Sequence, residues 1–131
     1  MMCIVILLMA CKNGNTEQAN CYNCQRGQEA MSEEKYDEAL TYLEKELTEN
    51  PKNGYAWKLK QFIYFNMDIK GESITSGEKA LKYLPRKDKE AMAMVHNKLG
   101  ETYYYMNNLE KAKEELLKAI KCSPNDVKNG Q

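Results

Sequence analysis

Residues 99–112, which read LGETYYYMNNLEKA, place a glycine and three consecutive tyrosines inside a stretch that otherwise has the pattern of an amphipathic helix. Glycine in the middle of a helix costs about 1 kcal/mol relative to alanine. We therefore expect Gly100 to have a packing role that offsets this cost.

The spacing of the three prolines gives the chain a repeat. Pro51 and Pro85 are 34 residues apart, and Pro85 and Pro124 are 39 apart, which is one period of 34 with five extra residues. The segments between the prolines contain alanine, leucine and many charged residues but few β-branched ones, a composition that favours helices. A period of 34 closed by a proline is typical of helical hairpins that bury their apolar faces against one another.

The last unit carries a family pattern almost throughout. Its residues at the pattern positions are Leu99, Gly100, Tyr103, Ala112, Leu116, Ala119 and Pro124. At these spacings the unit resembles a tetratricopeptide repeat. The resemblance implies that the two helices of the hairpin pack closely at Gly100, where the small Ala112 faces it. It also makes Tyr103 the buried aromatic, while Tyr104 and Tyr105 turn toward other surfaces.

The two earlier units match less fully. The first has Gly27, residues 36–40 (YDEAL), Leu43 and Pro51 at pattern positions, and the middle unit has Trp57, Tyr64, Ala80 and Pro85. The middle unit departs at its centre, where Gln61 occupies the glycine place and Gly77 a large apolar place. We interpret this pair as an exchange of bulk across the hairpin. By resemblance, the repeat-packing residues are Gly27, Ala39, Trp57, Tyr64, Ala80, Leu99, Gly100, Tyr103, Ala112 and Ala119.

The resemblance implies an all-α fold, a right-handed α-solenoid of three helical hairpins. We expect six antiparallel helices at residues 16–32, 36–49, 54–67, 72–84, 88–106 and 109–122. The repeats occupy 20–126, as 20–53, 54–87 and 93–126, and an insertion at 88–92 lengthens the start of the fifth helix, with Asp88 as its N-cap. Only a short polar tail, 127–131, follows, without a helix to cover the last hairpin. The lysines and glutamates of 110–121 favour a polar outer face on the sixth helix over contact with a partner.

The N-terminus bears on location. Residues 1–10 are wholly apolar, and 11–19 form a polar tether and the start of the first helix. Ten residues are too few to span a bilayer as a helix, which takes about 20. Leu8, Ala10 and Cys11 resemble the bacterial lipobox, in which the cysteine is lipidated, although Met9 is large for its place and no basic residue precedes the apolar run. The resemblance implies a short or truncated lipoprotein signal segment, lipidation at Cys11 and anchoring in a bacterial cell envelope. A cytoplasmic protein with an apolar N-terminus is the alternative.

The remaining reactive side chains do not form a known catalytic motif. Cys21 and Cys24 have a C-x-x-C spacing, but no second pair or strand–helix setting accompanies them. A disulfide, a redox role and a plain packing role stay open, whereas a zinc site would have to recruit His96 or Cys122. His96 stands where the family often packs a large residue, and no nucleophile accompanies it. We therefore expect no enzyme, no catalytic residue, no cofactor and no bound metal.

Charge and resemblance together indicate the kind of partner. The 19 basic and 19 acidic residues give a formal charge of zero without a long block of one sign, which argues against nucleic acid. In the family, the first helix of each hairpin lines a concave groove that binds peptides. The residues that the resemblance places there are Cys21, Cys24, Gln28, Tyr55, Lys58, Phe62, Phe65, Met94, Asn97, Glu101 and Tyr104.

Some family members hold the C-terminal carboxylates of heat-shock chaperones in this groove. The corresponding places here are occupied by Cys24, Gln28, Leu59, Met94 and Lys98, so only one charge could serve, and we do not expect such a ligand. The expected function is a non-enzymatic protein–protein interaction scaffold that binds a peptide or partner helix and is lipid-anchored. A soluble cytosolic adaptor or regulatory module is the alternative, and neither the partner's identity nor the oligomeric state follows from the sequence.

Overall fold

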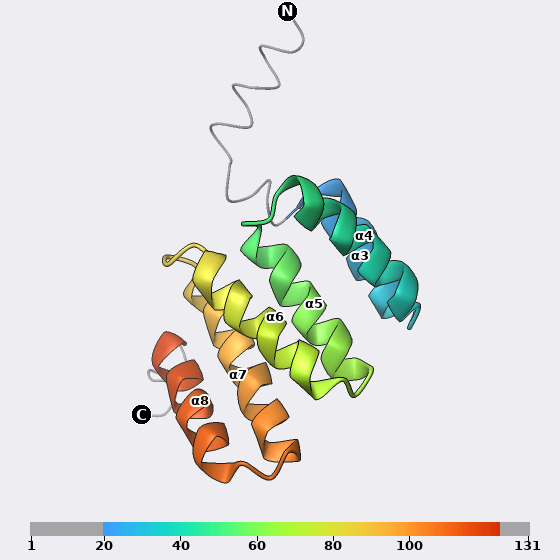
Figure 1. Ribbon diagram of the computed structural model, residues 1–131. Helices are drawn as coiled ribbons and strands as arrows, with labels where there is room; N and C mark the ends of the chain where they lie inside the picture. Colours follow the sequence, from blue (N-terminus) through green and yellow to red (C-terminus); the bar gives the residue numbers. More distant parts are fainter. Residues whose placement is uncertain (1–19, 124–131) are drawn as a thin grey trace, which may run out of the picture.

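The computed structural model describes residues 20–123, which form six α-helices in three antiparallel hairpins (Figure 1). The hairpins are α3 (Tyr22–Ser32) with α4 (Tyr36–Glu49), α5 (Gly54–Asn66) with α6 (Lys70–Tyr83), and α7 (Lys89–Tyr105) with α8 (Leu109–Cys122). They stack in chain order, because α5 contacts both helices of the hairpin before it and α7 does the same. The expected all-α solenoid of three hairpins is confirmed.

Three helix starts deserve comparison with the expected ones. α3 begins at Tyr22, not at residue 16, because Cys21 is the N-cap and its Sγ accepts a hydrogen bond from the backbone N–H of Cys24 at 2.9 Å. Residues 16–19 lie outside the described residues. α6 begins at Lys70, two residues earlier than expected. Asp88 caps α7 as predicted, since its Oδ1 accepts a hydrogen bond from the N–H of Ala91 at 3.0 Å.

Each hairpin turns through the same backbone conformation. Glu34, Asp68 and Asn107 all have φ 61°, in the left-handed region. In each turn the next residue donates its N–H to a carbonyl five positions back, from Lys35 to Ala30, Ile69 to Tyr64 and Asn108 to Tyr103. Such bonds close the C-terminal end of a helix. The left-handed residues are 34 and 39 positions apart, like the prolines, so the five extra residues leave the turn unchanged.

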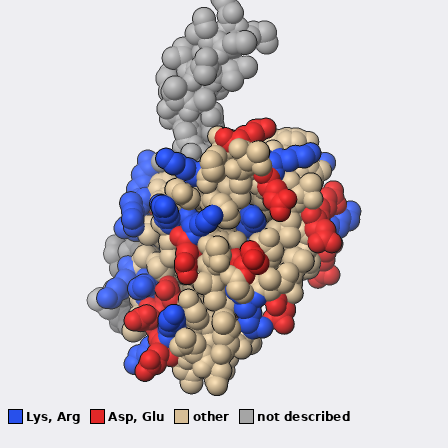
Figure 2. All heavy atoms as spheres, viewed as in Figure 1, with Lys and Arg blue, Asp and Glu red and all other residues tan. Residues whose placement is uncertain are grey.

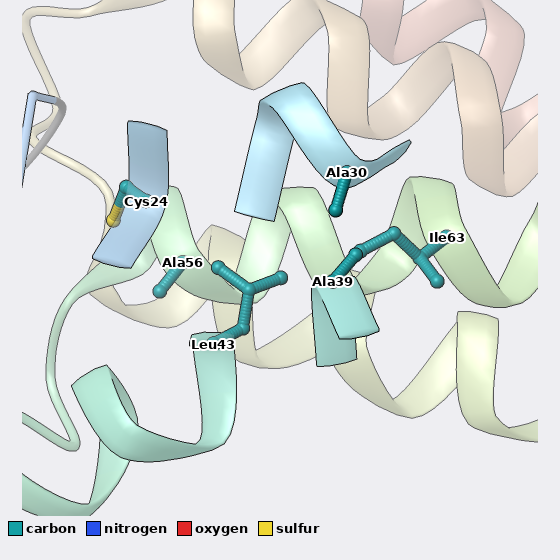
Figure 3. Close-up of a cluster of buried hydrophobic side chains, with 6 residues drawn as sticks. All are labelled: Cys24, Ala30, Ala39, Leu43, Ala56 and Ile63. Carbon is teal, nitrogen blue, oxygen red and sulfur yellow. The ribbon is translucent and has the colours of Figure 1, made fainter. Parts of the chain in front are cut away.

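Small and medium apolar side chains fill the interior of the array. One cluster, shown in Figure 3, comprises Cys24, Ala30, Ala39, Leu43, Ala56 and Ile63. A second comprises Ala80, Leu84, Ala91, Met92, Val95 and Leu99. Of the ten residues assigned to repeat packing, Trp57, Tyr64 and Tyr103 are partly buried and the other seven are buried. The repeat pattern therefore identifies residues that lie between the helices.

The close helix contact at Gly100 is visible in the structure. A methyl group there would come within 2.7 Å of the Leu116 side chain and 3.2 Å of the Ala112 carbonyl oxygen. Gly27 is in an equivalent position, where a methyl group would lie 3.1 Å from the Leu43 side chain. In the first and last hairpins, a leucine of the second helix thus occupies the space that the glycine leaves.

In the middle hairpin the small and large residues at this helix contact are exchanged, so that the glycine lies on the second helix. A methyl group at Gly77 would collide with the side-chain amide nitrogen of Gln61 and come within 3.0 Å of Leu99 Cδ2. Gln61 is fully buried and donates its Nε2–H to the Val95 carbonyl of α7 at 3.2 Å. Gln61 therefore fills the space next to Gly77, as the exchange of bulk inferred from the sequence requires.

The outer face of α8 is less polar than its sequence indicates. Leu109, Leu117 and Ile120 are 58%, 48% and 53% exposed. A hollow of about 470 Å³ lies between α7 and α8, and its lining residues include Ile120, Leu116 and Met94. The expectation of a polar outer face is wrong, because these large apolar side chains remain exposed among the lysines and glutamates.

Candidate partner-binding groove

Side chains of α5 and α7 form the centre of the candidate groove. Tyr55, Lys58, Phe62 and Phe65 recur at spacings of three and four along α5, which places them on one face of the helix. All four are partly buried. The matching stripe on α7 consists of Met94, Lys98, Glu101 and Tyr105. We call these eight residues the groove.

Phe62 lies near two lysines from different helices. The Lys58 Nζ atom is 6.0 Å from the centroid of the Phe62 ring, and the Lys98 Nζ atom is 5.1 Å from it. Lys98 Nζ also lies 4.2 Å from the centroid of Phe65. Ammonium groups at such distances are attracted to an aromatic ring face. These contacts join α5 and α7 into a continuous aromatic and cationic cluster.

Carboxylates of α7 and its N-cap balance the two lysines. Lys98 Nζ lies 3.4 Å from Glu101 Oε1. Burial lowers the pKa of Lys58, while the carboxylates of Asp88 and Glu90 oppose that shift. The groove is therefore a mixed surface of aromatic, cationic and anionic groups, with little excess of either charge.

One end of the groove is closed by a bond between helices. The Tyr55 hydroxyl donates a hydrogen bond to Asp88 Oδ2 at 2.6 Å. Burial, together with this bond to the Asp88 carboxylate, raises the pKa of Tyr55, so the hydroxyl keeps its proton at neutral pH. A hollow of about 290 Å³ lies here, lined in part by Gln28 of α3, Lys58 and Met94.

The other end of the groove is aromatic. The ring centroids of Phe65 and Tyr105 are 6.1 Å apart. They line a hollow of about 440 Å³ together with Glu101 and Lys70. Tyr104, whose ring packs edge-on against Tyr105 with centroids 5.6 Å apart, is 61% exposed and is not among the lining residues of this hollow.

The structure divides the residues that the sequence assigned to the groove. Tyr55, Lys58, Phe62, Phe65 and Glu101 come together as described. By contrast, Asn97 lines the hollow between α7 and α8. Tyr105, not Tyr104, lies next to Phe65. The run of positions 94, 98, 101 and 105 is the signal that could have selected Lys98 and Tyr105, because it follows the helical period.

Cys24 does not line the groove. Its side chain is fully buried, at the opposite end of the first core cluster from Ile63 (Figure 3). The expectation that it faces the groove is therefore wrong, because the start of α3 turns this residue into the interface with α4 and α5.

Two segments of the chain match the tetratricopeptide repeat family, residues 22–53 and residues 93–126. The first coincides with the α3–α4 hairpin and the second with most of α7 and all of α8, and together they cover half of the chain. The chain is a tetratricopeptide repeat protein. Repeats of this family are protein–protein interaction modules, so the groove belongs to a fold that serves protein binding.

The tetratricopeptide repeat protein is also similar to the Hsp70-Hsp90 organizing protein of Triticum aestivum. The two are 24% identical over 102 residues. The aligned region makes up 78% of this chain but 17% of the wheat protein, so the chain spans less than a fifth of that relative.

In this tetratricopeptide repeat protein, Cys21 and Cys24 are joined by a disulfide. Of the three interpretations left open by the sequence, the disulfide is thus the observed state. Within residues 20–123, the one cluster of candidate metal ligands is Cys21, Cys24 and Glu46, and its two sulfur atoms are bonded to each other. Neither His96 nor Cys122 belongs to it.

His96 of the tetratricopeptide repeat protein packs between α7 and α8. Its Nδ1 lies 2.7 Å from Glu115 Oε2, and the two side chains are 11% and 15% exposed. Glu115 also lies 3.6 Å from the Lys118 ammonium. The histidine therefore has a carboxylate partner within the interface of its own hairpin, as a packing residue requires.

The surface of the tetratricopeptide repeat protein carries both signs of charge. Lysine and arginine side chains and aspartate and glutamate side chains are both spread over the face shown in Figure 2. None of the helices in the described part of the chain is long and apolar enough to cross a membrane.

Proposed function

We propose that this tetratricopeptide repeat protein is a non-enzymatic scaffold that binds an internal segment of a partner protein, extended or helical, in the groove between α5 and α7. The observation that carries this proposal is the cluster of Phe62 and Phe65 with Lys58 and Lys98. The two rings are partly buried and partly open, so they offer apolar area to a ligand on a surface that is already held in place by its own contacts.

The charges of the groove favour an internal segment over a free C-terminal carboxylate. Lys98 is already paired with Glu101, and Lys58 lies in the field of Asp88 and Glu90. A ligand carboxylate would have to compete with these groups, and it would gain little from lysines that are already compensated. An apolar ligand side chain on Phe62 meets no such competition. A chaperone's C-terminal carboxylate is therefore a poor ligand for this groove.

Replacing Phe62 by alanine should abolish most of the binding. Peptides selected from a random phage-displayed library on the full-length protein serve as probes, and their affinities are measured by fluorescence anisotropy. Loss of a central aromatic contact is expected to weaken binding by at least about tenfold, which corresponds to about 1.4 kcal/mol. Leu117→Ala is the matched control, because Leu117 is an exposed apolar residue of α8 outside the groove. Circular dichroism checks that both variants keep their helices.

Two outcomes would contradict the proposal that an internal segment of a partner binds in the groove. Equal affinity for wild type and Phe62→Ala would move the binding surface elsewhere. If amidation of the peptide C-terminus abolished binding, the ligand would be a terminal carboxylate and not an internal segment. Retained binding of amidated peptides, together with the loss in Phe62→Ala, is the result we expect.

We also propose that the protein is held in a bacterial cell envelope by a lipid on Cys11, a residue that lies outside the described part of the chain. The support is the likeness of residues 8–11 to a lipobox. Radiolabelled palmitate should be incorporated into the full-length chain in a bacterial host, and Cys11→Ser should carry no label. A wild-type chain that takes up no label and keeps its apolar N-terminus in the intact mass would favour the soluble cytosolic adaptor.

A further inference from the structure

A second candidate site lies at the start of α3, where three elements meet. Cys21, the N-cap of the helix, is partly exposed, whereas Cys24 is fully buried. Glu46 of α4 is only 6% exposed, and its carboxylate and the two sulfur atoms lie within 4.8 Å of one another. The side-chain amide of Asn53 donates a hydrogen bond to Glu46 Oε2 at 2.7 Å and another to Cys24 Sγ at 3.7 Å.

Cross-linking of the chain does not account for the disulfide in this cluster. The disulfide joins residues three apart, so it closes a very short loop and restricts the unfolded chain little. Glu46 is a buried carboxylate whose Oε2 accepts hydrogen bonds from the side-chain amides of Asn53 at 2.7 Å and Asn50 at 3.3 Å, so it is held in place beside the two sulfur atoms. A covalent bond that restricts little, next to a buried carboxylate, is better suited to chemistry at sulfur than to cross-linking.

We propose that Cys21 and Cys24 form a redox-active pair that exchanges with accessible disulfides of proteins or small thiol compounds. This role goes beyond the proposed scaffold function: binding in the groove involves no chemistry, and the exchange reaction is a separate activity at the start of α3. Cys21 is the sulfur that meets the substrate, Cys24 is the resolving sulfur, and Glu46 accepts the proton of Cys24.

The exchange balances without any further reactant. In the reduced pair, the Cys21 thiolate attacks a substrate disulfide, forms a mixed disulfide and releases one substrate thiolate. Glu46 then takes the proton of the Cys24 thiol, and the Cys24 sulfur attacks Cys21 Sγ and expels the second substrate thiolate. The substrate disulfide is reduced to two thiols, and the pair is oxidised to the disulfide seen in the structure. The reverse sequence oxidises a substrate dithiol.

The local geometry assigns different roles to the two sulfurs. Cys21 Sγ accepts the Cys24 N–H at 2.9 Å and lies at the positive end of the α3 dipole, and both features favour its thiolate. Its partial exposure lets a substrate reach it. Cys24 is inaccessible to a substrate, but it lies beside Glu46 and Asn53, which supply a proton acceptor and a hydrogen-bond donor.

The test measures which cysteine of the full-length protein reacts first with a small disulfide. The reduced protein is mixed with glutathione disulfide, quenched with iodoacetamide and digested with trypsin. Residues 13–26 then form one peptide that contains Cys21 and Cys24 and no other cysteine. Tandem mass spectrometry should find glutathione on Cys21 first, with Cys21 reacting about tenfold or more faster than Cys24. Cys24→Ser should trap the mixed disulfide on Cys21.

A conservative variant of Glu46 tests whether this residue accepts a proton from Cys24 or only supports the local structure. Glu46→Gln keeps an oxygen to accept the Asn53 hydrogen bond but cannot take a proton. It should leave the first step unchanged, slow the second about tenfold, and let the mixed disulfide accumulate near neutral pH but less at alkaline pH. Glutathione appearing first on Cys24, or equal second steps in wild type and Glu46→Gln, would overturn the proposal. If Cys24→Ser fails to fold by circular dichroism, the wild-type quench decides alone.

Discussion

Replacing Gly54 by alanine is expected to destabilise the protein by about 3 kcal/mol, because the new methyl group would overlap backbone atoms. Built onto Gly54, it would lie 2.5 Å from the nitrogen of Leu84 and 2.7 Å from the carbonyl carbon of Tyr83. These atoms belong to the end of α6, which crosses the start of α5 at this point. A side chain can rotate away from such an overlap, but a backbone segment cannot, so the two helices would have to separate.

Gly71→Ala provides the matched control. Gly71 also lies in the first turn of its helix, α6, but a methyl group there would meet nothing within 4 Å. Alanine at this site should stabilise the protein by about 0.5–1 kcal/mol, since it restricts the unfolded chain and favours the helix. Urea unfolding followed by circular dichroism measures both effects. Similar changes in the free energy of unfolding for the two variants would contradict the close approach at Gly54.

Gly77→Leu is the second substitution with a large expected effect. The leucine would collide with Gln61 and press on Leu99, and we expect a loss of about 3 kcal/mol in the free energy of unfolding. The reason is specific to this hairpin, because Gln61 already occupies the space that a large apolar residue would need at position 77. Gln61 is held there by the hydrogen bond that it donates to the Val95 carbonyl.

A second variant tests the cause of that loss. Combining Gly77→Leu with Gln61→Gly restores the arrangement of the other hairpins, with the glycine on the first helix and the leucine on the second. In a double-mutant cycle the two changes should be coupled favourably by about 1–3 kcal/mol. Strictly additive losses, or a stabilising effect of Gly77→Leu alone, would show that bulk is not exchanged across this hairpin.

The sequence predicts the fold well because the fold is repetitive. The proline period and the residues around Gly100 locate all three hairpins, and four of the six helix starts lie within one residue of the expected positions. The Gln61 and Gly77 pair is also found from sequence, since each departs from a pattern that the other units follow. Information of this kind is local or periodic, and a single sequence contains it.

The misses have a different origin. Two close approaches were missed: Gly54 lies against the end of α6, and Cys24 lies near Glu46. In both cases the residues are more than 20 positions apart, and no periodic pattern relates them. The choice between Tyr104 and Tyr105 is a matter of helix phase, because one residue turns a side chain by about 100°. On α8 the many charged residues led to the prediction of a polar outer face. The exposure of its leucines was missed because composition does not show which face of the helix lacks a neighbouring helix.

The same left-handed turn joins the two helices of each hairpin, and each turn is closed by backbone hydrogen bonds within that hairpin. Its closing bonds join residues five apart, as from Lys35 to Ala30, so they depend on nothing elsewhere in the chain. The contact from one hairpin to the next is likewise repeated, with each first helix resting on both helices before it. Stability in such arrays is close to a sum over units and their nearest neighbours, so a duplicated α5–α6 block would lengthen the array only if the helix after it supplied what α7 supplies here, such as the Val95 carbonyl that accepts the Gln61 hydrogen bond.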